Sequence, residues 1–347
     1  MRRTGLFIAL ICGATLFAEN ERDGWTYNEK QVGTYSTGYL KRNYVPLKKP
    51  TGIKASSLKS KSLEDFGQKL SPVLDQGNCG SCVIFAFATL VQDQYMIKGQ
   101  NPPPISTQHY MNCSSGGQCN GAYGEEIAQD AVRLGKTGGF YPLSAYPYTA
   151  RSGRCQTKDS EKFAPIASYK TLDGSAYSIL EAIHGGHGVA VGIAANSSFQ
   201  GYQSGMYAAC NSTNINHYVV ITGLNCGNAV DANGNCKFDE DGEVEGREKS
   251  EAWVKVKNSW GKGWGEDGHV RMRLYGRNGK RCNGIAGYDG DAQTLENGLP
   301  FNPVPVVQDF TVTSGSKTLK VHLKDNHYSK DALEKKLQTV VESVGVK

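Results

Sequence analysis

The sequence predicts a fold in which helices and strands are segregated along the chain. The stretch 82–98 is rich in apolar residues and free of Gly and Pro, which favours a buried helix. The stretch 124–134 has apolar residues at helical spacing and is followed by a glycine, which predicts an amphipathic helix. From about residue 165 to 290 the pattern changes to short strand-like runs at 189–193, 218–222, 252–257 and 269–274. A helix-rich half is therefore expected to precede a strand-rich half.

Composition and the first residues favour an exported globular protein. The 347 residues are 39% hydrophobic and 20% charged, which suits one large domain or two lobes. A net charge of +5 does not indicate a nucleic-acid partner. Residues 1–18 combine two arginines with a short apolar run, which is typical of a signal peptide. That run is too brief to span a membrane, so no membrane attachment is expected after signal removal.

Four polar residues, in three separate parts of the sequence, have settings that suit thiol-based acyl transfer. Cys82 falls in the first turn of the expected helix, whose N-terminus favours a thiolate nucleophile. His217 precedes the strand at 218–222 and would act as the imidazolium partner and general acid. Asn258 follows the strand at 252–257 and would orient that imidazole. Gln76, six positions before Cys82, would stabilise the oxyanion together with the Cys82 backbone N–H.

The pair Cys79 and Cys82 also forms a CxxC, which can be a redox pair or half of a metal site. A zinc site needs a second Cys/His pair at similar spacing, and a redox CxxC belongs near a βαβ pattern. The sequence offers neither. These alternatives also leave Gln76, His217 and Asn258 unexplained, so the peptidase interpretation is favoured.

The motifs QGNCGSC at 76–82, NH at 216–217 and KNSWG at 257–261 together resemble the papain family of cysteine peptidases. The resemblance covers about residues 58–290. It implies an α+β fold of two lobes, one helical and one β-barrel-like, with the active-site cleft between them. It also implies hydrolysis of peptide bonds in peptide or protein substrates through a thioester, without a cofactor, by a monomer.

The resemblance further implies a set of substrate-binding residues. Gly121 and Ala122 stand where the family uses two glycines to bind an extended peptide through the backbone. Tyr123, Gly192 and Tyr218 would line a pocket, next to Gly124, for an apolar or aromatic residue. The further substrate contacts are Gly80, Asn216 and Trp260. No paired-histidine loop of the carboxydipeptidase type is visible, so endopeptidase action is favoured. An exopeptidase variant and a catalytically silent binding protein are the alternatives, the latter because Val83 and Ala122 depart from the family pattern.

Cysteine usage points to an oxidising compartment. Of ten cysteines, Cys12 lies in the signal and Cys82 is the expected nucleophile, which leaves eight. By the resemblance, the pairs are Cys79–Cys119, Cys113–Cys155 and Cys210–Cys282, and Cys226 and Cys236 remain to close a local loop. We therefore expect secretion, or residence in an exported, lysosome-like or periplasmic compartment.

The domain organisation departs from the family at both ends. Residues 19–57 are polar and basic with interspersed tyrosines, and we interpret them as a short prosegment that inhibits the enzyme without a covalent bond. The peptidase domain is expected over 58–298. Residues 299–347 form a C-terminal extension of unknown role, with two short strands and a helix predicted.

Residues 225–250 form an acidic insertion in this domain. Its side chains at Asp231, Asn233, Asn235, Asp239 and Asp241 begin like a calcium loop, but Cys236 stands where such a loop needs Gly. A solvated loop closed by a disulfide is the favoured interpretation, and a calcium site is the alternative.

Overall fold

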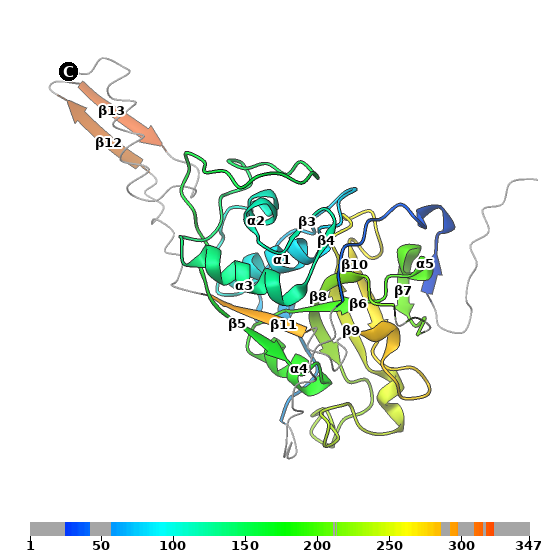
Figure 1. Ribbon diagram of the computed structural model, residues 1–347. Coiled ribbons are helices and arrows are strands. Elements are labelled where there is room, and N and C mark those ends of the chain that lie inside the picture. The colour runs from blue at the N-terminus through cyan, green and yellow to red at the C-terminus, as the bar shows by residue number, and fades with distance from the viewer. Residues whose placement is uncertain are drawn as a thin grey trace, which may run out of the picture.

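Helix α1 (Cys82–Ile97) lies between a helical lobe and a β-sheet lobe (Figure 1). The computed structural model describes residues 25–41, 57–210, 212, 214–285, 292–297, 309–314 and 317–322. Residues 82 to 95 of α1 are all buried. One side of the helix packs on other helices and the opposite side packs on strand β8, which explains why its sequence is apolar all round.

The helical lobe contains two further helices, α2 (Thr107–Cys113) and α3 (Gly124–Gly135). The side chain of Ser106 caps α2 by accepting from the His109 N–H at 2.9 Å. Helix α3 is amphipathic and turns its apolar side to α1. The short strands β3 (Gly117–Gln118) and β4 (Gly121–Ala122) pair antiparallel just before α3. This lobe therefore places β4 at the side of α1 where Cys82 lies.

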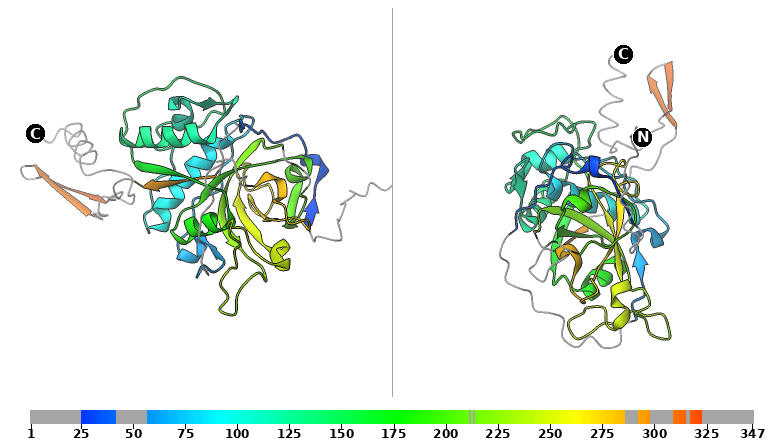
Figure 2. Two further views of the ribbon diagram at one scale, coloured as in Figure 1. Left: turned by 60° about the horizontal axis from the view of Figure 1, so that its bottom comes forward. Right: turned by 90° about the vertical axis from the view of Figure 1, so that its right-hand side faces the viewer.

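The second lobe is built on a sheet that, within the described residues, has nine strands (Figure 2). Its strand order is β1–β7–β10–β9–β8–β6–β11–β5, and β2 also pairs with β8. The strands are β1 (Trp25–Tyr27), β2 (Lys61–Ser62), β5 (Ile166–Leu172), β6 (Val189–Ile193), β7 (Tyr202–Tyr207), β8 (His217–Asn225), β9 (Trp253–Lys257), β10 (His269–Arg273) and β11 (Ala292–Asn297). All named pairs are antiparallel except β7 with β10.

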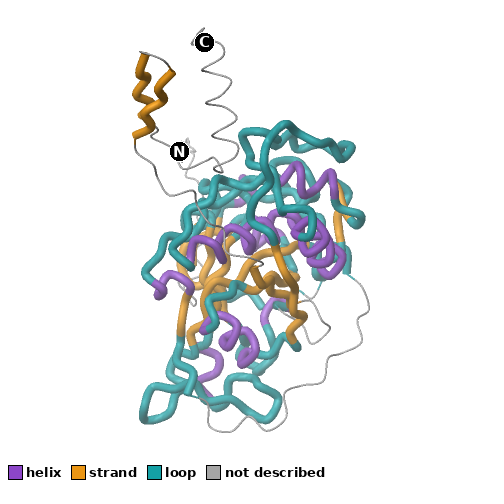
Figure 3. Tube along the Cα trace, turned by 90° about the vertical axis from the view of Figure 1, so that its left-hand side faces the viewer, coloured by secondary structure: helices purple, strands orange, loops and turns teal. Residues whose placement is uncertain are grey.

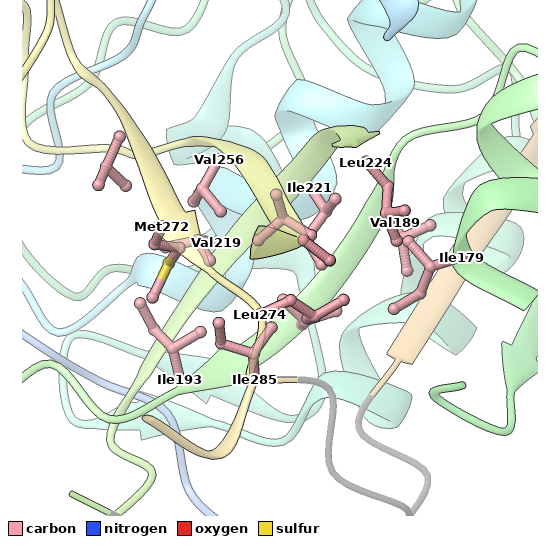
Figure 4. Close-up of a cluster of buried hydrophobic side chains, with 14 of the residues drawn as sticks. Ile179, Val189, Ile193, Val219, Ile221, Leu224, Val256, Met272, Leu274 and Ile285 are labelled. Atoms are coloured by element: carbon pink, nitrogen blue, oxygen red, sulfur yellow. The ribbon is translucent and has the colours of Figure 1, made fainter. Parts of the chain in front are cut away.

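The core of the second lobe lies against this sheet and is lined by branched aliphatic side chains (Figure 4). Val189, Val219, Ile221 and Val256 come from β6, β8 and β9 and are all buried. Helix α4 (Ala176–His184) packs against β6 and β8 and adds Ile179 to the cluster, whereas the short helix α5 (Ser197–Gln200) precedes β7. Figure 3 shows the strands in the middle of the molecule, with helices above and below them and long loops at the top and bottom of the view.

A buried ion pair joins α1 to β9. The Lys257 ammonium lies 3.1 Å from the Asp93 carboxylate, and these side chains are 1% and 2% exposed. Ser71 completes the cluster, because its carbonyl and hydroxyl accept from Lys257 at 2.6 and 2.8 Å and its N–H donates to Asp93 at 2.7 Å. Lys257 immediately precedes Asn258, so this cluster fixes the end of β9 relative to the helix that begins at Cys82.

The leader segment, which we define as residues 25–41, runs over the surface from β7 to β4 (Figures 1 and 2). Its strand β1 pairs antiparallel with β7 and is followed by a 3₁₀ turn at Glu29–Gln31. The predicted signal peptide at 1–18 and residues 19–24 and 42–56 of the predicted prosegment lie outside the described residues. In the C-terminal extension, β12 (Asp309–Ser314) and β13 (Lys317–His322) pair antiparallel apart from the main sheet, and the predicted helix lies outside the described residues.

Candidate active site

Cys82 is the first residue of α1, and its side chain is fully buried. It is a free thiol, the only one among the cysteines of the described residues. Burial raises the pKa of the Cys82 thiol to about 12, and hydrogen bonds from the backbone N–H groups of Tyr218, Gly38 and Val83 offset part of that effect. The thiol is therefore protonated at neutral pH in this state. The hydrogen bond from Tyr218 also shows that the start of α1 and the start of β8 meet at this sulfur.

His217 is the first residue of β8, which pairs with β6 on one side and β9 on the other. Its Nε2 lies 2.8 Å from Oδ1 of Asn258, and the same oxygen accepts from the Ser259 N–H at 2.8 Å. Because a carboxamide oxygen only accepts, Nε2 carries the proton, and Nδ1 of the neutral ring is left with a free lone pair. Within the described part of the chain, Nδ1 has no hydrogen-bond partner.

The imidazole of His217 is enclosed as well as oriented. The Trp260 indole stacks on it with ring centroids 4.4 Å apart. Burial lowers the pKa of His217 to about 4, although the hydrogen bond to Asn258 favours the protonated form. Near neutral pH the structure therefore holds a neutral imidazole and a neutral thiol.

Gln76 is fully buried, and both ends of its carboxamide are engaged. Nε2 donates to the carbonyl oxygens of Cys79 at 2.9 Å and of Ser36 at 3.1 Å. Oε1 accepts from the Ser259 hydroxyl at 2.7 Å, and the Gln76 N–H donates to the Ser259 carbonyl at 2.9 Å. Ser259 thus contacts both the residue that orients His217 and the residue that donates to Ser36.

The leader segment crosses this site and forms backbone hydrogen bonds with both lobes. Ala122 accepts from the Leu40 N–H at 2.9 Å and donates to the Gly38 carbonyl at 2.8 Å, which makes a parallel bridge between Tyr39 and Ala122. The Tyr39 N–H donates to the Asn216 carbonyl at 3.1 Å. An extended chain is therefore held by Ala122 on one side and by Asn216 on the other.

Two tyrosine rings of the leader segment stack on rings of the site. Tyr35 lies on Trp260 with centroids 4.6 Å apart, and the Trp260 Nε1–H donates to the Ser36 carbonyl at 3.0 Å. Tyr39 is 5% exposed and stacks on Tyr218 with centroids 4.9 Å apart. The Ser36 carbonyl consequently accepts from two side chains outside the leader segment, those of Gln76 and Trp260.

The sequence of the chain matches the family model described as "Papain family cysteine protease" over residues 60–287. The chain belongs to the papain family. The cathepsin L-like proteinase of Fasciola hepatica is 31% identical over 220 residues, which cover 62% of this chain and 60% of that protein. Cysteine proteinase 5 of Dictyostelium discoideum is 30% identical over 249 residues, which cover 71% of each protein. The chain thus spans about three fifths of the length of the Fasciola relative.

Solved structures of papain-family proteases share the fold. The bromelain protease of Ananas comosus in complex with the E64 inhibitor is 26% identical, with a TM-score of 0.53, over 70% of this chain and 99% of that one. A recombinant stem bromelain precursor aligns with a TM-score of 0.59 over 80% of this chain and 85% of that one, at 24% identity. The predicted two-lobed α+β fold is confirmed.

The remaining predicted substrate contacts lie around Tyr218 and Cys82. Gly192 in β6 is the register partner of Tyr218 in β8, and Tyr123 precedes α3. A Cβ on Gly124 would lie 2.4 Å from the Tyr218 hydroxyl, so glycine is needed there for the tyrosine to fit. The Gly80 N–H donates to the Cys119 carbonyl at 2.9 Å. The Gly80 carbonyl oxygen lies so close to Gly38 that a Cβ on Gly38 would be 1.8 Å from it.

Four disulfides cross-link this papain-family chain. Cys79 bonds to Cys119, which leaves it unavailable for a CxxC redox pair with Cys82. The other bonds join Cys113 to Cys155, Cys210 to Cys282 and Cys226 to Cys236. These are the four pairs expected at the sequence level.

The acidic insertion uses its aspartates inside its own turns. Asp231 accepts from the N–H groups of Asn233 and Asn235, both at 2.8 Å, and Asp239 accepts from those of Asp241 and Glu243 at 3.0 and 2.9 Å. Across the described ranges, no group of three or more His, Cys, Asp or Glu side chains is placed to hold a metal ion. No helix in the described ranges is long and apolar enough to cross a membrane.

Two residues of the site are not predicted from the sequence. Ser259 lies inside the KNSWG motif at 257–261, which could have pointed to it. Gln293 of β11 is buried and accepts a hydrogen bond from the Tyr218 hydroxyl, but it lies 75 positions away and no local motif marks it.

Proposed function

We propose that this chain is the precursor of an exported cysteine endopeptidase, with Cys82, His217, Asn258 and Gln76 as its catalytic residues. One observation carries the proposal. The carbonyl oxygen of Ser36 accepts a hydrogen bond from the Gln76 side chain, and the N–H of Gly38, two residues further along, donates to the Cys82 sulfur. A polypeptide thus lies where a substrate would react.

The chemistry starts once the leader segment has left and water has access to the site. Loss of burial lowers the pKa of Cys82 and raises that of His217, so a thiolate and an imidazolium form together. The sulfur attacks a peptide carbonyl, and Gln76 and the Cys82 N–H stabilise the oxyanion. His217 then gives its proton to the leaving amine, and water hydrolyses the thioester. Asn258 keeps the imidazole in the required orientation throughout.

The direction in which the leader segment runs through the cleft explains why the enzyme does not cleave it there. The resemblance assigns Ala122 and the Tyr218 pocket to substrate residues that precede the scissile bond. The leader places there Gly38 and Tyr39, which follow Ser36 in the sequence. Its chain therefore runs opposite to a substrate, and it blocks the site without offering a correctly oriented bond.

The leader segment also keeps the reacting groups neutral. It covers Cys82 and so adds to the burial that raises the pKa of Cys82 and lowers that of His217; at Cys82 the hydrogen bond from the Gly38 N–H offsets this burial effect only in part. Latency in this account has two sources, which are occupation of the cleft and suppression of the ion pair.

Tyr39 indicates which substrates the pocket accepts. A flat ring stacks on Tyr218, which supports a preference for Tyr or Phe at the second residue before the scissile bond. A peptide library varied at that position alone should be cleaved fastest with aromatic residues by the processed enzyme. A preference for Arg or Asp would contradict this pocket assignment.

Export is supported by the predicted signal at 1–18 and by the four disulfides, which persist in oxidising compartments. The test is the N-terminus and location of the protein in its own cells. Finding residues 2–18 still attached to a reduced cytosolic protein would contradict export.

The proposal as a whole is tested with processed protein and a short peptide substrate. Wild-type protein should turn over and Cys82→Ala should not. A folded, correctly processed protein that binds peptides without cleaving them would favour the silent binding protein. Removal of only terminal residues from a longer peptide would favour the exopeptidase variant.

A further inference from the structure

The leader segment makes a second set of contacts well away from Cys82, on the α5–β7 edge, which we define as residues 200–207. Its strand β1 pairs with β7, and the Thr26 and Ser204 hydroxyls lie 2.9 Å apart. The Asn28 N–H donates to the Gly201 carbonyl at 2.6 Å, and the Gly33 N–H donates to the Gln200 side chain at 2.6 Å. None of these contacts is needed to obstruct the cleft, which residues 35–39 already fill.

Trp25 is the anchor of this second set. It is 7% exposed, and its ring centroid lies 5.0 Å from that of Tyr207 and 6.5 Å from that of Tyr202. Aromatic rings packed at such distances make large contributions to association. The space that the Trp25 ring fills against Tyr202 and Tyr207 is called the Trp25 slot below, and it becomes accessible when the leader leaves. One edge of β7 is then unpaired as well, because β10 pairs with β7 only on the opposite side.

The α5–β7 edge adjoins one side of the cleft, which we assign to the substrate residues that follow the scissile bond. Along the leader, the chain passes from Trp25 on this edge through Tyr35 on Trp260 to Ser36 at Gln76. Because the leader runs opposite to a substrate, these earlier residues mark the path of substrate residues that follow the scissile bond. Trp25 lies eleven positions before Ser36, and the intervening turn at Glu29–Gln31 shortens that path.

We propose that, in the processed enzyme, the α5–β7 edge is a secondary binding site for protein substrates, which takes an extended segment downstream of the scissile bond with an aromatic side chain in the Trp25 slot. The inference rests on the proposed peptidase function. The segment adds as a strand to β7 through main-chain hydrogen bonds, and the aromatic side chain supplies selectivity. Such a substrate strand runs parallel to β7, as β10 already does on the other edge.

A side chain at Gly201 would block the α5–β7 edge. A Cβ there would lie 2.1 Å from the Tyr27 ring, and the three nearest atoms all belong to the leader segment. Its φ of −82° and ψ of −1° suit any residue. Gly201→Leu in the processed enzyme therefore fills the edge without straining the chain.

The test compares three peptide substrates that share one sequence around the scissile bond. One ends shortly after that bond, one has a twelve-residue extension with Trp at successive positions, and one has Ala in place of Trp. We expect the best Trp substrate to exceed its Ala counterpart about tenfold in kcat/KM. Gly201→Leu should reduce that ratio to about one and leave the short substrate unchanged.

A competitor made of residues 24–34 provides the second measurement, because it ends before Tyr35 and does not reach the cleft. It should slow the long Trp substrate only, and its Trp25→Ala version should do nothing. Equal rates for the Trp and Ala substrates, or equal inhibition of short and long substrates, would overturn the proposal. Failure to cleave even the short substrate would instead contradict the peptidase function itself.

Discussion

The side-chain amide of Gln76 donates to the carbonyl oxygen of Ser36 at 3.1 Å, although 40 residues separate them. The same amide serves two states in our account. In the precursor it holds the leader segment, and in the processed enzyme it stabilises the oxyanion. A single substitution should therefore weaken both latency and catalysis.

Gln76→Ala should lower kcat of the processed enzyme about 10²- to 10³-fold, which is the usual effect of losing one oxyanion donor. The same variant should bind a peptide of residues 25–41 more weakly than wild type does. Gln129→Ala, on the exposed side of α3, is the matched control and should change neither quantity. An unchanged kcat in folded Gln76→Ala would remove Gln76 from the mechanism.

Gly38 should be the residue of the leader segment that tolerates a side chain least. A Cβ at this position would lie 1.8 Å from the Gly80 carbonyl oxygen, which belongs to the backbone and has little room to move. Gly38→Leu should therefore displace the leader and give the uncut chain activity close to that of processed enzyme on a short substrate. Leu40→Ala, at an exposed neighbour, should leave the uncut chain latent. Continued latency of Gly38→Leu would mean that the leader does not bind as described.

Acidification should destabilise the leader-bound state through His217. Its folded pKa is about 4, below the value of about 6.5 in an unfolded chain, so the unfolded chain gains the proton first. Stability should therefore fall as the pH drops from about 6.5 to 4, by up to about 3 kcal/mol. Thermal unfolding of uncut Cys82→Ala protein across this range measures the effect.

The matched comparison for this pH dependence is the same protein with His217→Gln in addition. His109, whose pKa burial also lowers to about 4, contributes in the same direction but is common to both proteins. The two stability curves should converge as the pH falls. Parallel curves would exclude His217 as the acid-sensitive group.

Removal of one partner of the buried Lys257–Asp93 pair should be strongly destabilising, whereas removal of both should not. Lys257→Met leaves Asp93 as a buried, unpaired carboxylate, which should cost about 3–5 kcal/mol of unfolding free energy. Adding Asp93→Leu should recover much of that loss, since no buried charge then remains. Denaturant unfolding of the three proteins measures both effects, and a double variant less stable than Lys257→Met would contradict this view of the pair.

The sequence predicts the elements whose signals are local. The helix expected at 82–98 is found at Cys82–Ile97, the one at 124–134 is found at Gly124–Gly135, and strand 189–193 has the same bounds. The strand expected at 218–222 extends over His217–Asn225, because its pairing with β9 continues past the apolar run. Propensity does not report how far a partner strand reaches.

The candidate site divides in the same way. Cys82, His217, Asn258 and Gln76 stand in motifs that can be recognised one at a time, and the fold brings these motifs together. The contacts of Ser259, Gln293 and Lys257 join residues far apart in sequence, and no periodicity encodes them. The course of the leader segment was equally hidden, since backbone groups and single rings hold it in place. For Gly38, only the structure reveals why a side chain is excluded.

The most direct test of the account is active-site titration of uncut and processed protein with a thiol-directed epoxide, followed by mass spectrometry of the labelled peptide. We predict about one label per molecule of processed enzyme, on Cys82 alone, with loss of activity in proportion. The uncut chain should be labelled little at neutral pH, because the leader segment covers a protonated thiol. Folded, processed protein that is not labelled at Cys82, or an uncut chain that is labelled equally fast, would contradict it.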